Sequence, residues 1–361
     1  MKYPLTALYY AAVLLTSATV SNATTIRAAS PLVQIEGRMM PTARLGVLLG
    51  YPGVTFHLRF RGSSLSLHAA TTAEAADFDV VVDGGQATRF RLPKGEAEVV
   101  VFQGGADAEH SVELTHCTES YNGLCEIESF TSAGEFLPAP PLSDRRLLFI
   151  GDSFTAGAAT EVQPGKPINP SKSSRQNARL SYGFLLARRL TAQVQIVAYA
   201  GRGLMRDWQG LKSVKCLPEI YGYALPDNPA TFWSPTNYVP DVIGVCTGND
   251  FDIGLPDEFD FVRVCSNFLR QLRQDAPRSS IFLILSPILT DAPAGIPQRT
   301  VSRAYLDEVV KHLNDPRITV VEVGAYSVVP GDGHPDGAAH QAIANRLEPY
   351  FRRALPIELP K

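Results

Sequence analysis

Residues 147–157 read LLFIGDSFTAG, an apolar run followed directly by a turn between two glycines. The run Leu147–Ile150 is typical of a strand buried on both faces. A tight turn after it would expose the hydroxyl of Ser153 at the carboxyl end of the strand, a suitable place for a nucleophile. Gly-Asp-Ser also occurs in ordinary surface turns, so the surrounding sequence has to decide between the two interpretations.

Downstream of this stretch, apolar strands alternate with segments of helical periodicity. Such alternation implies a parallel sheet with helices on both faces. Further strands are expected at Val194–Tyr199, Asp241–Cys246, Ile281–Leu285 and Ile318–Val323, and helices at Asp257–Gln274 and His340–Ala354. Residues 211–240, rich in Pro, Tyr and Asn, predict a long loop over one rim. Its aromatic residues either bind sugar rings or pack the loop onto the domain: Tyr221, Tyr223, Phe232, Trp233 and Tyr238.

Upstream of the stretch, the hydrophobic pattern has period two from about Val33 to Phe130, with Gly and Asp-Gly between the runs. This alternation predicts an all-β sandwich. The proline-containing stretch Phe136–Leu142 suits a short, stiff connection. We therefore expect a β-sandwich over residues 24–137 and an α/β domain over residues 138–361.

The N-terminus has the pattern of a signal peptide. Lys2 precedes the apolar run Leu5–Val20, and Ser21–Ala23 has the small-x-small form that signal peptidase cleaves. We expect residues 1–23 to be removed from a secreted or periplasmic protein. The alternative is a membrane anchor, for which the apolar run is short.

The composition limits the partners and cofactors. The 361 residues are 45% hydrophobic and 19% charged, with a net charge of −3, so the sequence offers no basic patch for nucleic acid or an anionic membrane. Among five cysteines, Cys117 and Cys125 flank a short loop and are the expected disulfide pair, whereas Cys246 and Cys265 are expected to be buried thiols. No Cys/His cluster has metal-ligand spacing, so neither a metal nor an organic cofactor is expected.

Residues of complementary chemistry follow the other predicted strands. Gly201 and Gly203 follow the second strand, and either could offer a backbone N–H unshielded by a side chain. Asn249 follows the third strand, and His334 lies in a turn-rich loop after the fifth. Because ligands collect at the carboxyl ends of parallel strands, all of these groups are expected at one edge with Ser153. There His334 would act as the base, and the N–H of Ser153, a glycine N–H and the Asn249 amide would stabilise an oxyanion.

A second histidine, His340, lies at the start of the last predicted helix and competes for the role of base. We prefer His334, whose loop can reach over the rim. His340 is expected to help hold that loop.

These residues resemble the motif blocks of the SGNH (GDSL-type) hydrolase superfamily, here Ser153, Gly201 or Gly203, Asn249 and His334. Over nearly the whole mature chain, the sequence is more similar to carbohydrate esterase family 2, the acetylxylan esterases. The features that carry this resemblance are Thr118-Glu119, the segment Leu217–Tyr221, and Asp332-x-His334-Pro335. The resemblance implies a jelly-roll sandwich followed by a flavodoxin-like SGNH domain.

Two positions depart from the pattern. Many SGNH enzymes place the acid three residues before the histidine, where this chain has Gly331; the nearest acid is Asp332, as in family 2. Asp332 therefore either completes a triad or is dispensable in a Ser–His dyad oriented by a backbone carbonyl. The family often has a tryptophan between the acid and the histidine, where Gly333 stands here, so an aromatic sugar platform is missing at that position.

The sequence thus predicts a serine esterase that deacetylates an O-acetylated polysaccharide, such as xylan, mannan or a related glycan, through an acetyl-enzyme on Ser153. The expected partner is this polysaccharide or its oligosaccharides, with no nucleic acid and, after signal removal, no membrane. One alternative is another SGNH lipase or thioesterase, which needs an apolar acyl groove. A second is a non-catalytic carbohydrate-binding protein, against which the intact Ser153, Asn249 and His334 argue.

Overall fold

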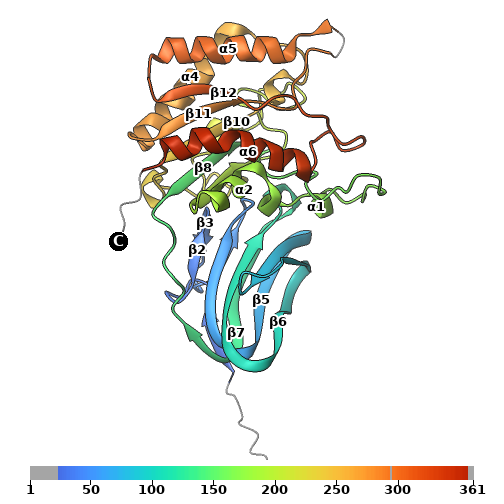
Figure 1. The fold of residues 1–361 in the computed structure, drawn as a ribbon, viewed down its shortest axis with the longest axis vertical. Helices are drawn as coiled ribbons and strands as arrows, with labels where there is room; N and C mark the ends of the chain where they lie inside the picture. Colours follow the sequence, from blue (N-terminus) through green and yellow to red (C-terminus); the bar gives the residue numbers. More distant parts are fainter. Residues whose placement is uncertain (1–22, 293–294, 357–361) are drawn as a thin grey trace, which may run out of the picture.

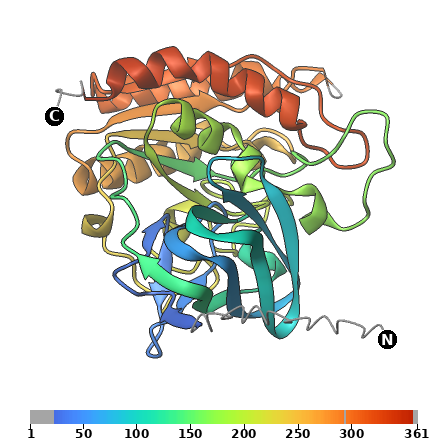
Figure 2. The ribbon, with the colours of Figure 1, turned by 60° about the horizontal axis from the view of Figure 1, so that its bottom comes forward.

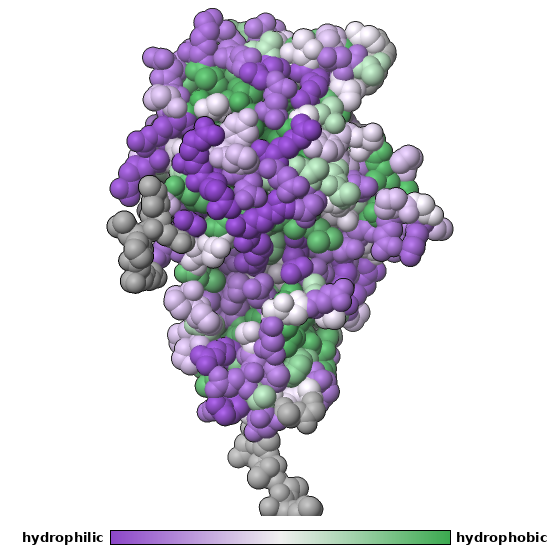
Figure 3. All heavy atoms as spheres, viewed as in Figure 1, coloured by the Kyte–Doolittle hydropathy of each residue, from purple (hydrophilic) through white to green (hydrophobic). Residues whose placement is uncertain are grey.

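The computed structural model describes residues 23–292 and 295–356. The expected signal peptide, residues 1–23, lies outside these residues except for Ala23. An all-β unit, residues 24–137, is followed by an α/β unit, residues 146–354 (Figure 1). The face seen in Figure 3 carries mainly polar residues, with apolar residues in separate patches. Within the described ranges, no helix is long and apolar enough to cross a membrane.

The all-β unit is an antiparallel sheet folded around its own core. Its strands are β1 (Thr24–Arg27), β2 (Gln34–Glu36), β3 (Met39–Pro41), β4 (Val47–Leu49), β5 (Thr55–Val82), β6 (Thr88–His116) and β7 (Cys125–Leu137). The long strands β5 and β6 pair along most of their length and shift register at bulges, so that Val80 lies opposite both Leu114 and Thr88. Alternate residues of β5, such as Phe56 and Phe60, are fully buried. The period-two prediction is confirmed for this unit.

The α/β unit contains a five-stranded parallel sheet in the order β12-β11-β10-β8-β9. The strands are β8 (Arg146–Gly151), β9 (Gln193–Ala198), β10 (Val242–Cys246), β11 (Ser280–Leu285) and β12 (Ile318–Glu322). The helices are α1 (Lys172–Arg175), α2 (Tyr182–Arg189), α3 (Leu217–Ile220), α4 (Glu258–Asp275), α5 (Gln298–Leu313) and α6 (Gly337–Ala354).

Helices cover both faces of this sheet, as the alternation of elements predicted. α2 and α6 pack over Phe149 on one face, and α4 and α5 pack over Leu148 and Ile243 on the other. The buried faces follow from the apolar strands, whose observed bounds differ from the predicted ones by at most one residue at either end. The helices predicted at 257–274 and 340–354 correspond to α4 and α6.

The all-β unit covers the edge of the parallel sheet, as Figure 2 shows from the side of this unit. β9 is an edge strand, and the buried carboxylate of Glu36 accepts a hydrogen bond from its Val194 N–H at 2.6 Å. Such cover removes an unpaired edge that would otherwise be open to other chains. Arg38 is also buried, and its guanidinium lies 4.8 Å from the ring centre of Trp233 in the long loop. The two units therefore share a buried polar interface.

The long loop over residues 211–240 packs onto the α/β unit. Tyr221, Trp233 and Tyr238 are between 6% and 9% exposed and belong to the core that contains α4. The packing interpretation is confirmed for these three aromatic residues. Phe232, in contrast, is 76% exposed.

The expected disulfide between Cys117 and Cys125 is wrong, because all five cysteines are buried free thiols. Cys117 N–H donates to the carbonyl of Asp77, whereas Cys125 lies opposite Thr71 in β5. The loop between the two cysteines therefore does not bring them onto facing strands. The expectation of buried thiols at Cys246 and Cys265 is confirmed.

Candidate active site

Ser153 lies at the carboxyl end of β8. The chain adds β9 on one side of β8 and β10 on the other, so the order in which strands are added to the sheet reverses here. β8 is flanked by β9 and β10, which makes its end the switch point at which open α/β sheets bind ligands. A Cβ at Gly151 would lie 2.2 Å from the carbonyl oxygen of Cys246, so only glycine allows the chain to leave the strand this closely. Ser153 is 9% exposed.

Asp152 fixes the turn that presents Ser153. Its carboxylate accepts hydrogen bonds from the N–H of Phe154 at 3.0 Å and from the N–H of Gly248, just after β10, at 2.9 Å. Burial raises the pKa of Asp152 to about 6. Through these two hydrogen bonds, Asp152 connects the end of β8, which precedes Ser153, to the end of β10, which precedes Asn249.

Ser153, His334 and Asp332 form a hydrogen-bonded row. The Ser153 Oγ to His334 Nε2 distance is 2.7 Å, and the His334 Nδ1 to Asp332 Oδ1 distance is also 2.7 Å. Because an ionised carboxylate only accepts hydrogen bonds, Nδ1 carries the proton and donates to Asp332. Nε2 is then free to accept the Ser153 proton, which is the arrangement a general base requires. The two groups that the sequence predicted to meet thus lie within hydrogen-bonding distance.

The two candidate glycines differ in what their N–H groups do. Gly203 N–H donates to the carbonyl of Arg206 at 3.0 Å, and a Cβ at Gly203 would lie 2.5 Å from the carboxylate of Asp250. Gly203 is thus required for close packing, and its N–H is already bonded within the loop. Gly201 has a φ of +75°, and within the described residues its N–H donates no hydrogen bond.

Asn249 begins a 3-10 turn, Asn249–Phe251, directly after β10. Its Nδ2 donates one hydrogen bond to Asp252 Oδ2 at 2.8 Å. The second Nδ2 proton has no acceptor among the described residues. The turn also includes Asp250, whose carboxylate accepts hydrogen bonds from the N–H groups of residues 204–206 and so holds the loop that follows Gly201.

His340 has a structural role. Its ring is fully buried and stacks on Phe154 with a centroid distance of 4.5 Å. Nδ1 accepts a hydrogen bond from Tyr182 N–H, at the first residue of α2, at 3.0 Å. Burial lowers the pKa of His340 to about 3, so the ring is neutral. The sequence analysis expected His340 to hold the loop of His334. The structure shows that it holds the start of α2 instead.

Two residues that support the site were given no role from the sequence. Glu119, from the all-β unit, accepts hydrogen bonds from Ala200 N–H and from Gln176 Nε2, both at 2.7 Å. Arg175 Nε lies 2.8 Å from Asp332 Oδ2. Their partners are far along the chain, so no local pattern reveals these contacts. The only signal was that Glu119 belongs to one of the segments that carry the family resemblance.

The fold and this arrangement define an α/β serine hydrolase. The serine has an oriented histidine as its base, and among the residues that the structure describes the N–H groups of Ser153 and Gly201 have no acceptor, so they are available for a developing negative charge. Such a site performs acyl transfer. In the part of the chain that the structure describes, no group of three or more His, Cys, Asp or Glu side chains is placed to hold a metal ion.

Several known proteins resemble the chain over nearly its full length. Residues 35–141 match the family model described as carbohydrate esterase 2 N-terminal. An acetylxylan esterase / glucomannan deacetylase from Cellvibrio japonicus is 32% identical over 343 residues, 94% of each chain. The structure of a family two carbohydrate esterase from Cellvibrio japonicus has a TM-score of 0.87 at 31% identity, covering 92% of this chain and 98% of that one. A second such esterase, from Clostridium thermocellum in complex with cellohexaose, has a TM-score of 0.81 at 28% identity, covering 89% and 98%.

The chain belongs to carbohydrate esterase family 2. It is therefore a carboxylic ester hydrolase, as the sequence predicted. The wider SGNH resemblance also holds at the level of the fold, since a GDSL-like lipase from Bacteroides ovatus matches 94% of the chain with a TM-score of 0.60 at 13% identity.

Proposed function

We propose that this esterase removes acetyl groups from an O-acetylated polysaccharide through an acetyl-enzyme on Ser153. The observation that carries the proposal is the 2.7 Å hydrogen bond between Ser153 Oγ and His334 Nε2, with Asp332 on the other ring nitrogen. A non-catalytic binding protein has no need for a histidine oriented on a serine hydroxyl. This contact therefore favours the enzyme over the binding-protein alternative.

The reaction proceeds in two halves. In the first, His334 Nε2 takes the hydroxyl proton as Ser153 Oγ attacks the acetyl carbonyl carbon, and Asp332 stabilises the imidazolium. The tetrahedral oxyanion accepts hydrogen bonds from the N–H groups of Ser153 and Gly201 and from Asn249 Nδ2. The ester C–O bond then breaks, and His334 gives its proton to the departing sugar hydroxyl. In the second half, His334 takes a proton from a water molecule as the water oxygen attacks the acetyl carbon, and it returns this proton to Ser153 Oγ as acetate leaves.

The substrate class follows from the relatives. One is named an acetylxylan esterase / glucomannan deacetylase, and the structure of another is a complex with cellohexaose. We assign acetylated xylan or glucomannan to this chain on that basis. Position 333 is a glycine with a φ of +90° and open space around it. Because glycine has no side chain, this chain has no aromatic platform for a sugar at that position.

Trp208 is the residue we propose to bind a sugar ring instead. It is 54% exposed, and its Cδ1 lies 2.7 Å from where a Cβ on Gly201 would be. The backbone N–H of Trp208 donates to the Gly201 carbonyl at 3.0 Å, which holds this residue beside the proposed oxyanion site. An exposed indole in that place offers an apolar face to a sugar whose acetyl group is at Ser153.

Replacing Ser153 by alanine tests the proposed function. We expect Ser153→Ala to abolish acetate release from acetylated xylan and glucomannan while its thermal midpoint stays near that of the wild type. Wild-type protein should cleave a nitrophenyl acetate faster than the octanoate. A wild type that prefers the octanoate, or a Ser153→Ala variant with unchanged turnover, would contradict the proposal.

Trp208→Ala tests the sugar platform. Loss of a stacking face should raise KM for acetylated polysaccharide several-fold, in line with the ~1 kcal/mol that an aromatic contact contributes. The kcat/KM for nitrophenyl acetate, which has no sugar, should change little. Phe232→Ala, at an aromatic residue that is 76% exposed in the long loop, is the matched control and should leave both values unchanged. Equal losses on both substrates would show that Trp208 supports the loop and not the sugar.

We further propose that residues 24–137 form a jelly-roll sandwich, that residues 138–361 form the hydrolase domain, and that the protein is exported after removal of residues 1–23. A polymeric substrate outside the cell supports export. Sequencing the N-terminus of the mature protein tests it, with Thr24 expected as the first residue.

A further inference from the structure

We infer that Arg175 is a positioning residue of the reaction: it fixes the carboxylate of Asp332 and is itself held in place by the all-β unit. This inference rests on the proposed triad. It assigns to the N-terminal unit a part in catalysis, in addition to any binding of substrate.

Arg175 and Asp332 form a buried ion pair. The Arg175 Nε to Asp332 Oδ2 distance is 2.8 Å, a contact between charges without an aligned N–H···O hydrogen bond, and the side chains are 9% and 6% exposed. Asp332 Oδ1 accepts from His334, so the two oxygens of one carboxylate hold the catalytic ring on one side and the guanidinium on the other. Arg175 is too buried to bind a polysaccharide directly. Its influence on the reaction therefore passes through Asp332.

The loop that carries Asp332 needs such a restraint. It contains two glycines with positive φ, Gly331 at +81° and Gly333 at +90°, on either side of the acid. Asp332 N–H donates to the Val329 carbonyl, but this contact fixes the backbone and not the direction of the carboxylate. Rotation of the carboxylate would release His334 Nδ1, so the ion pair with Arg175 selects the orientation in which the imidazole faces Ser153.

The surrounding charges act in the same direction. Although partial burial opposes the effect, the hydrogen bond from His334 and the positive charges of Arg175 and Lys172 lower the pKa of Asp332. Lys172 lies in α1 with Arg175. The carboxylate therefore stays ionised, as its role requires.

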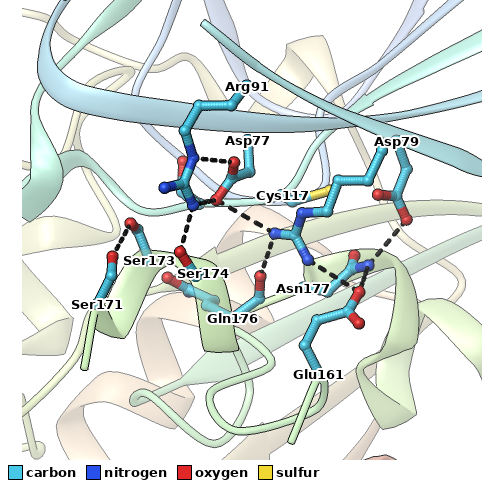
Figure 4. Close-up of polar contacts among 12 residues, drawn as sticks. Asp77, Asp79, Arg91, Cys117, Glu161, Ser171, Ser173, Ser174, Gln176 and Asn177 are labelled. Carbon is cyan, nitrogen blue, oxygen red and sulfur yellow. Dashed lines mark hydrogen bonds and ion pairs between the residues drawn. The ribbon is translucent and has the colours of Figure 1, made fainter. Parts of the chain in front are cut away.

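Residues 161–177, which we call the strap, carry Arg175 and are clamped by β5 and β6 (Figure 4). Arg91 forms a two-point ion pair with Asp77, with both distances at 2.8 Å, and also bonds Ser174 of the strap. Arg89 donates to the Gln176 carbonyl at 2.6 Å and lies 2.8 Å from Glu161.

β5 and β6 contact the residues immediately before and after Arg175 in the sequence. Asn177 Nδ2 donates to Asp79 Oδ2 of β5 at 2.8 Å and to Glu161 Oε1 at 2.6 Å. Ser174 and Gln176, the immediate neighbours of Arg175, are both bonded to the all-β unit. α1 has only four residues and could not hold Arg175 by itself. The backbone position of Arg175 is therefore set by β5 and β6, and Asp332 pairs with the guanidinium from there.

A double-mutant cycle between Arg175 and Asp332 tests the inference. We expect Arg175→Met to lower kcat on nitrophenyl acetate by about 10- to 100-fold with KM unchanged, by analogy with the loss of residues that orient metal-binding side chains from behind. In the Asp332→Asn background the same change should cost less than about twofold. Arg175→Lys, which keeps the charge, should recover part of the kcat.

Lys166→Met is the matched control, because it removes a positive charge from an exposed part of the strap and should leave kcat unchanged. An Arg175→Met loss of the same size in both backgrounds would overturn the inference, as would wild-type kcat in Arg175→Met. If Arg175→Met does not fold, Arg175→Lys in the two backgrounds gives the same comparison. Ser153→Ala separately tests the proposed function. If this variant is still active, the proposed role of the Ser153–His334–Asp332 triad is wrong, whatever the result for Arg175.

Discussion

Asn249 has one side-chain proton on Asp252 and a second that points to no acceptor among the described residues. A neutral donor held by a neighbouring carboxylate is oriented in advance and needs no rearrangement when negative charge develops. We therefore expect Asn249→Ala to lower kcat by about 10²- to 10³-fold, the usual loss for a single oxyanion donor. Steady-state kinetics on nitrophenyl acetate measure this.

Asp252→Ala is the control for Asn249→Ala. It removes the residue that orients the amide but leaves the donor, so its kcat should fall by less than tenfold. Equal losses in the two variants would mean that the turn as a whole, and not the Asn249 amide, supports the reaction. Thermal midpoints of both variants show whether the turn still folds.

At the level of single residues, the sequence predicted the reacting groups better than the groups that hold them. Ser153 and Asn249 come soon after apolar strands, His334 lies in the loop between the last strand and the last helix, and the chemistry of all three is distinctive. Arg175 and Glu119 have ordinary local sequences, and their roles come from partners that only the folded chain brings near. The sequence could not distinguish Gly201 from Gly203 either, because the difference lies in which N–H group is already bonded within the folded loop.

At the level of elements, the parallel sheet was predictable because its strands are short, buried runs of apolar residues. The all-β unit was predictable in kind but not in detail. The separate runs around Phe56–Phe60 and Val80–Val82 belong to one continuous strand, β5, which bends at bulges that alternation alone does not reveal. The false Cys117–Cys125 pairing has the same cause, since it depended on which strands are neighbours. The strap, which is clamped by side chains and has little regular structure, gave no sequence signal.

At the level of the whole molecule, Glu119 joins the all-β unit to two parts of the active site. Its carboxylate accepts hydrogen bonds from Ala200 N–H, next to Gly201, and from Gln176 of the strap. Burial is the largest influence and raises the pKa of Glu119 from 4.5 to about 8, with Asp152 and Asp227 adding to the rise against these two hydrogen bonds. The folded protein therefore binds a proton at this interface over a pH range in which the unfolded chain does not.

This difference in proton binding makes stability depend on pH. The contribution of Glu119 is fully present below pH 4.5 and is lost as the pH rises through about 8, with a slope of up to about 1.4 kcal/mol per pH unit for one proton. Glu119→Gln does not titrate. The free energy of unfolding of this variant, relative to wild type, should thus rise steadily between pH 5 and pH 8, as measured by urea unfolding. Glu96→Gln, at an exposed position of β6, should give no such trend. A constant difference across this range would mean that Glu119 keeps the same charge in the folded and unfolded states, and that the contact between the two units is insensitive to pH at this point.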